Sequence, residues 1–179
     1  MQNRKEQIVR THALAWGFVF LAAMPAFAHV TLEQQDATIG GPTKLTFRVP
    51  HGCDAQPTVK LRVMIPEGFI AAKPMPKAGW TLEVSQGAYA KSHDYFHGVK
   101  LSEGTKEISW KGSLPSDYYD EFVVSGFISR DFSAGSMLYF PVVQECPNGS
   151  HSWVEIPKDD QSGHDLKEPA PGLRLKAKQ

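Results

Sequence analysis

The sequence lacks the short motifs that mark many families of enzymes. Its 179 residues contain no GxSxG, HExxH, P-loop or GxGxxG pattern, so a serine hydrolase, a zinc protease or a nucleotide-binding enzyme is not indicated. It also lacks an excess of either charge, because 19 basic residues balance 19 acidic ones and no basic run occurs. A nucleic-acid-binding protein would need a basic patch, so that class is not indicated either.

Long apolar runs are also missing, apart from one near the N-terminus. Residues 14–23 are apolar, follow three basic residues and precede the small-residue motif Ala26-Phe27-Ala28. The run is too short to span a bilayer, and the pattern is that of a cleaved secretory signal. We therefore predict a signal peptide at residues 1–28, cleavage after Ala28, and a periplasmic or secreted product without a membrane-spanning segment. Without the signal, 16 basic and 18 acidic residues remain, a net charge of about −2.

Cysteine is scarce, and both cysteines, Cys53 and Cys146, belong to the predicted mature chain. An oxidising compartment favours a disulfide between them, which would close a loop of 93 residues. The alternative is a metal site built from two cysteines or from cysteine and histidine. It is less favoured, because the two cysteines are far apart in the sequence and neither belongs to a CxxC pair.

Helical periodicity is absent, whereas alternation of apolar and polar residues recurs throughout the mature chain. Many short strands separated by Gly and Pro turns predict an all-β fold, an immunoglobulin-like antiparallel β-sandwich, over residues 29–157. Residues 158–179 are predicted to form an extended C-terminal tail, with Leu173 and Leu175 packed against the domain. Pro141 lacks an amide donor and predicts an edge or a bulge. The expected strands are 29–33, 45–49, 59–65, 82–84, 95–101, 106–110, 122–128, 137–143 and 151–156.

Cleavage after Ala28 would make His29 the first residue of the mature chain. Its free α-amine and the Nδ1 atom of its own imidazole can then chelate one metal ion in a single ring. Both donors are nitrogens of intermediate softness, and Cu(II) has the highest affinity for such ligands among the divalent ions. The alternative is that His29 merely follows the cleavage site, so other residues have to decide between the two interpretations.

Other residues could contribute to a metal site, but each also has an ordinary structural explanation. His51 lies in a turn and could be an exposed loop histidine. His93 and His97 would suit a metal if they lay on a helix, but in the strand that their aromatic neighbours favour they would be about 13 Å apart, so we expect structural or surface roles. Trp153 is expected in the core and becomes informative only if it lies close to His29. Three scattered methionines could bind Cu(I) or simply fill a core or loop, namely Met64, Met75 and Met137.

Several longer motifs together extend over nearly the whole mature chain. They are Ala28-His29-Val30-Thr31-Leu32, Val49-Pro50-His51-Gly52-Cys53, Lys73-Pro74-Met75-Pro76-Lys77-Ala78-Gly79-Trp80, Tyr139-Phe140-Pro141-Val142-Val143-Gln144-Glu145-Cys146, Trp153, and His164-Asp165-Leu166-Lys167-Glu168-Pro169-Ala170-Pro171. In these motifs the chain resembles the YcnI-like secreted copper-binding domain family. Motifs of this length are specific.

The resemblance implies an immunoglobulin-like sandwich that binds Cu(II) through the amine and the ring of the N-terminal histidine, a half histidine brace. It also implies a tryptophan close to the metal, which corresponds to Trp153, and a carboxylate that completes the site. The sequence departs from the family at that last position, which falls at or beside His51, where no acid occurs. The third ligand is then His51 itself or Glu33, which shares a strand face with His29.

The leading hypothesis is a secreted or periplasmic Cu(II)-binding protein that acts in copper homeostasis as a chaperone, a store or a delivery protein. Such a protein would exchange copper with other periplasmic copper chaperones or with copper transporters. A rival is a copper-dependent monooxygenase, because polysaccharide monooxygenases also have an N-terminal histidine on a β-sandwich and use a second histidine, a part that His51 could play. The sequence shows no array of aromatics typical of a flat glycan-binding face. A third hypothesis is a metal-free structural or adhesion sandwich.

Overall fold

The structure, a computed structural model, describes residues 29–158 and 161–178, and the predicted signal peptide lies outside these ranges. The described residues consist mainly of strands, as the alternating pattern predicts. Helical turns in this part of the chain are limited to two short 3-10 segments, η1 (Phe96–Gly98) and η2 (Gly163–Asp165). No helix within the described ranges is long and apolar enough to cross a membrane.

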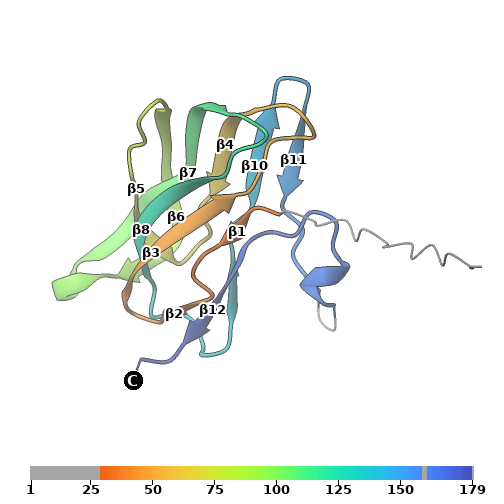
Figure 1. Cartoon of the computed structure of the whole chain (residues 1–179). Coiled ribbons are helices and arrows are strands. Elements are labelled where there is room, and N and C mark those ends of the chain that lie inside the picture. Colours follow the sequence, from red (N-terminus) through yellow and green to blue (C-terminus); the bar gives the residue numbers. More distant parts are fainter. Residues whose placement is uncertain (1–28, 159–160, 179) are drawn as a thin grey trace, which may run out of the picture.

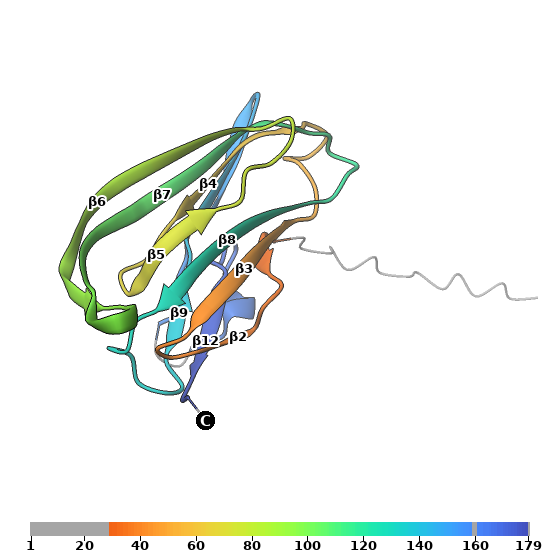
Figure 2. The same ribbon diagram turned by 90° about the vertical axis from the view of Figure 1, so that its left-hand side faces the viewer.

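Two antiparallel sheets pack face to face (Figure 1, Figure 2). The four-stranded sheet has the order β1-β3-β8-β5, and the five-stranded sheet has the order β11-β10-β4-β7-β6. The strands of the four-stranded sheet are β1 (Thr31–Leu32), β3 (Pro42–Val49), β8 (Asp120–Ile128) and β5 (Phe69–Pro74). Those of the five-stranded sheet are β11 (Gly149–Trp153), β10 (Val142–Cys146), β4 (Thr58–Met64), β7 (Lys100–Leu114) and β6 (Thr81–Asp94). The predicted antiparallel β-sandwich is confirmed.

A three-stranded sheet lies beside the sandwich, in the lower part of Figure 1. It consists of β2 (Asp36–Thr38), β12 (Gly172–Lys176) and β9 (Met137–Tyr139), with β12 parallel to β2 and antiparallel to β9. Leu173 and Leu175 of β12 are fully buried, as expected. The prediction of an extended tail over residues 158–179 did not include this strand, which makes Gly172–Lys176 part of the domain.

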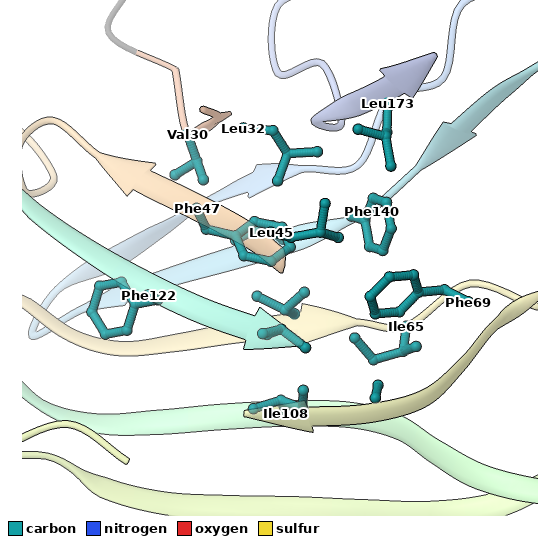
Figure 3. Close-up of a cluster of buried hydrophobic side chains, with 14 of the residues drawn as sticks. Val30, Leu32, Leu45, Phe47, Ile65, Phe69, Ile108, Phe122, Phe140 and Leu173 are labelled. Atoms are coloured by element: carbon teal, nitrogen blue, oxygen red, sulfur yellow. The ribbon is translucent and has the colours of Figure 1, made fainter. Parts of the chain in front are cut away.

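Apolar side chains from facing strands fill the space between the sheets (Figure 3). The ring of Phe140 meets those of Phe47 and Phe69 edge-on, with centroids 5.9 and 5.2 Å apart. All three rings are fully buried, as are Leu45 and Ile108. Burial of each such side chain contributes roughly 1.5–3 kcal/mol to the free energy of unfolding. The core therefore holds the two sheets, and the residues at their ends, in fixed positions.

Two predicted strands are interrupted, each for a local reason. Most of segment 95–101 is instead the connection of the β6–β7 hairpin, where His97 and Gly98 reverse the chain with φ angles of 55° and 74°, and its last residues, Lys100 and Leu101, begin β7. Segment 137–143 is not one strand, because it is broken at Pro141, which has no amide hydrogen to donate to a ladder. At this proline the chain passes from β9 in the three-stranded sheet to β10 in the five-stranded sheet.

Candidate metal centre

His29 is the first described residue and is separated from β1 by Val30. The alternation predicted for this segment is present, because Val30 and Leu32 are buried whereas Thr31 and Glu33 are exposed. His29 itself is half-buried. Two buried side chains directly after it anchor the segment to the sandwich, so His29 has a defined position on the domain.

If the register between β1 and β3 is extended towards the N-terminal side, the backbone nitrogen of His29 comes near the turn that contains His51. Thr31 pairs with Arg48 in this antiparallel ladder. Continuing the same register by two residues puts His29 opposite Pro50, one residue before His51. The backbone nitrogen of His29 is the atom that would become the α-amine after cleavage, so that amine would lie beside this turn.

The ring of His29 lies against the indole of Trp153, the last residue of β11. The two ring centroids are 5.2 Å apart and the ring planes are inclined by 56°. On the same strand, His151 stacks on Trp153 with centroids 5.0 Å apart and an angle of 25°. Trp153 therefore meets the condition set for it by the sequence, which is proximity to His29. Because β1 and β11 belong to different sheets, this contact lies at a junction of the two layers.

A chelate with the amine of His29 would use Nδ1 of its own ring, the ring nitrogen nearer to the backbone. The Nε2 atom of that ring is buried. Within residues 29–158 and 161–178, no group of three or more His, Cys, Asp or Glu side chains is placed to hold a metal ion. A terminal histidine supplies two donors from one residue, so a chelate of this kind does not need such a group.

A buried glutamine connects Trp153 to the turn that carries His51. The Oε1 atom of Gln144, on β10, accepts a hydrogen bond of 3.1 Å from Trp153 Nε1. Its Nε2 atom donates to the carbonyl oxygen of His51 and to Thr58 Oγ1, each at 2.7 Å. We did not single out Gln144 from the sequence, although a signal exists. Gln144 lies two residues after the buried Val142 on a strand, so its side chain faces the core as well. A polar side chain in the core needs hydrogen-bond partners.

The predicted disulfide between Cys53 and Cys146 is present, with a Cα–Cα distance of 6.1 Å. It fastens the turn that carries His51 to the end of β10. Within this turn, Cys53 and Gln56 exchange backbone hydrogen bonds of 3.1 and 2.9 Å. Gly52 is required there, because a Cβ atom would lie 1.8 Å from the carbonyl oxygen of Gln56. Both sulfur atoms are used by the bond, so the alternative of a cysteine metal site is excluded for the oxidised protein.

The two predicted candidates for a third ligand have different surroundings. His51 is half-buried, and its Nδ1 atom contacts the carbonyl oxygen of Gly52, which leaves Nε2 on the other side of the ring. The carboxylate of Glu33 forms an ion pair of 3.1 Å with Arg48 on β3. Glu33 is thus already engaged by a cation on the sheet surface, whereas His51 lies in the turn that follows β3.

A groove of about 490 Å³ opens beside His29, between β1, β12 and the segment that precedes β12. Glu168 fixes the base of that segment, since its carboxylate accepts hydrogen bonds from His151 Nδ1 (2.9 Å) and from the backbone nitrogen of Ser152 (3.0 Å). The segment predicted as a surface tail therefore forms one wall of the groove. No pattern in the sequence pointed to this role of Glu168.

The other predicted histidines lie away from this junction. His93 on β6 is buried, with its Nδ1 atom 2.7 Å from the carboxylate of Asp131 and its Nε2 atom 2.7 Å from that of Glu67. The pKa of Asp131 is lowered to about 2, chiefly by the hydrogen bond from Ser129 and also by that from His93. His97 is exposed in the hairpin connection. The expected structural or surface roles of these two histidines are confirmed.

The three methionines considered for Cu(I) lie on different elements. Met64 ends β4, Met75 follows β5, and Met137 begins β9. Met137 is the one of the three that lines the groove beside His29, and it is 41% exposed.

Comparison with known proteins identifies the family. Residues 29–175 match the family described as "Domain of unknown function (DUF1775)". The chain belongs to the DUF1775 family. The match begins at His29, the residue predicted to follow the signal peptide. No curated protein matches this DUF1775 chain.

A solved structure shows the same architecture as this DUF1775 domain. It is described as "Crystal structure of an uncharacterized protein from Nocardia farcinica reveals an immunoglobulin-like fold". The two structures agree with a TM-score of 0.59 and 25% sequence identity, over 83% of this chain and 99% of the other. This likeness confirms the predicted immunoglobulin-like sandwich. Neither comparison indicates an enzyme family.

Proposed function

We propose that this DUF1775 chain is a secreted or periplasmic Cu(II)-binding protein of the YcnI-like type, with a role in copper homeostasis. Copper is its cargo, held by the amine and Nδ1 of His29 after cleavage behind Ala28. The observation that carries the proposal is the position of His29. Its ring packs on Trp153 with Nε2 buried, and its backbone nitrogen lies two residues before β1, next to Val30, which is buried in the core.

The surroundings of the N-terminus favour His51 as the third donor. The β1–β3 ladder ends at the pair Thr31 and Arg48, so the nitrogen of His29, two residues earlier, would come near the turn that contains His51. The Nε2 atom of His51 lies on the side of the ring away from its contact with Gly52. Recruiting Glu33 would instead require its carboxylate to leave Arg48. An imidazole in place of the family's carboxylate keeps a donor that suits Cu(II).

The position of Trp153 suits a site that holds copper and releases it to a partner. The indole is 5% exposed, and it covers one side of the His29 ring. Three protein nitrogens and a covering aromatic ring would exclude water from that side without enclosing the ion. A chaperone or delivery protein needs such an arrangement, since an acceptor has to reach the metal from the open side.

Competition titration with Cu(II) tests the proposal. The reference protein begins at His29, as verified by mass spectrometry, and the test protein retains Ala28. We expect the extended form to bind Cu(II) far more weakly, because its His29 nitrogen is a peptide amide and cannot complete the chelate. The exposed His97 supplies a matched control, and His97→Ala should leave the affinity unchanged. Equal affinities of the extended and authentic forms would exclude the terminal chelate.

A further inference from the structure

We infer that Gln144 is a positioning residue of the copper site, in that it fixes the turn that carries His51 relative to Trp153, the residue that His29 contacts. The inference rests on the proposed function and extends it to a residue that would not touch the metal. It starts from the burial of Gln144, which is 1% exposed although it carries an uncharged polar amide. A buried amide costs free energy unless its donors and acceptor are paired, so its partners define one orientation.

The amide of Gln144 has partners on both sides. Both of its amide hydrogens are used, by the carbonyl oxygen of His51 and by Thr58 Oγ1, and its oxygen accepts the hydrogen bond from Trp153. The side chain of Trp153 has a single hydrogen-bonding atom, Nε1, so this bond fixes the direction in which the edge of the indole points. Cooperative strengthening is expected in such a buried network.

This amide links the five-stranded sheet to the connection between the two layers. Gln144 and Trp153 lie on β10 and β11 of the five-stranded sheet, whereas His51 lies in the connection from β3 of the four-stranded sheet to β4 of the five-stranded sheet. The disulfide makes a second link, because Cys53 lies two residues after His51 and Cys146 lies two residues after Gln144. The disulfide holds Cys53 but does not by itself fix the backbone of His51, two residues earlier. The hydrogen bond of 2.7 Å from Gln144 holds the carbonyl group of His51 directly.

Loss of the Gln144 amide would therefore disturb Trp153, which His29 contacts, together with the turn that carries His51. The indole would lose its acceptor, and the turn that carries His51 would lose its anchor to β10. Residues that orient metal ligands without touching the metal are worth about 10- to 100-fold in metal affinity. We expect a change of that size here, which separates a positioning role from a purely structural one.

Two substitutions at position 144 and one matched control test the inference. Gln144→Met keeps the length of the side chain but removes all three hydrogen bonds. Gln144→Glu keeps an acceptor for Trp153 Nε1 but turns a carboxylate oxygen towards the His51 carbonyl. Thr105→Val is the control, because Thr105 is 3% exposed and donates a hydrogen bond of 3.0 Å to the carbonyl oxygen of Ala72, away from the junction.

Cu(II) affinity, the electron paramagnetic resonance (EPR) spectrum and the free energy of unfolding are measured on all four mature proteins. We expect Gln144→Met and Gln144→Glu to bind Cu(II) at least about tenfold more weakly and with altered EPR parameters. Thr105→Val should lose stability but keep the wild-type affinity and spectrum. Should Gln144→Met not fold, Gln144→Glu decides.

Two outcomes contradict the inference, and they differ from each other. If the wild type binds Cu(II) and the Gln144 variants match Thr105→Val in affinity and spectrum, Gln144 has a structural role alone and the proposed function stands. If the mature wild type binds no Cu(II), the proposed function fails and the positioning role fails with it.

Discussion

Removal of the disulfide should cost a large part of the stability of the domain. The double variant Cys53→Ser with Cys146→Ser opens a loop of 93 residues in the unfolded chain. The chain-entropy relation gives about 4.6 kcal/mol for a closure of that length, which is an upper limit because unfolded chains retain structure. Domains of this kind are stable by about 5–15 kcal/mol, so the variant should fold but with a much smaller margin.

Urea unfolding followed by circular dichroism measures this loss. We expect the double variant and the chemically reduced wild type to lose the same free energy of unfolding, about 2–4.6 kcal/mol. Cu(II) affinity should fall in both, because the bond fastens the turn that carries His51 to β10. A loss below about 1 kcal/mol at an unchanged urea dependence would refute the argument that this loop constrains the unfolded state.

Three further predictions concern charges. His93→Phe removes two hydrogen bonds to the carboxylates of Glu67 and Asp131, and urea unfolding should show a loss of about 2–3 kcal/mol. Because the pKa of Asp131 is about 2 in the folded protein and near 3.9 when unfolded, its contribution is complete above about pH 4 and is lost as the pH falls towards 2, so acid titration of Asp131→Asn should show a shallower decline. Protons compete with Cu(II) for both nitrogens of His29, so competition titrations between pH 5 and 8 should show Cu(II) affinity falling as the pH is lowered. Well below pH ~6 the fall should reach up to about a hundredfold per pH unit, or about a thousandfold if His51 is also a ligand. In that second case, His51→Ala should make the pH dependence less steep. A flat wild-type profile would exclude the chelate.

The local pattern of the sequence was sufficient for much of the sandwich. The alternation of Val30 and Leu32 with polar neighbours predicted which side chains face the core, because that alternation follows directly from strand geometry. The sequence showed where the strand would break, at Pro141. It did not show that the chain passes there to another sheet, because that depends on long-range packing. The hairpin connection at His97 was missed, since a positive φ at a histidine leaves no signature in the pattern.

The candidate site could be predicted only in part. The predicted signal peptide pointed to His29, and the cysteine count predicted the disulfide, because both arguments use chemistry carried by single residues. The contact between His29 and Trp153 could not be derived, since it joins strands of different sheets that are far apart in sequence. The position of Gln144 on β10, two residues after an apolar residue, indicated a buried polar side chain. Nothing in the sequence indicated the role of Glu168, because that role depends on how the chain returns towards β12.

Every proposal made for this domain depends on Cu(II) binding to the amine and the ring of His29, and EPR with isotope labelling tests that binding. Mature protein beginning at His29 is prepared with natural histidine and with ¹⁵N-histidine, and each form is loaded with one equivalent of Cu(II). Terminal chelation predicts that the nitrogen hyperfine splitting changes on labelling, because both donor nitrogens of His29 then carry the other nuclear spin. A splitting that is identical in the two samples would contradict it.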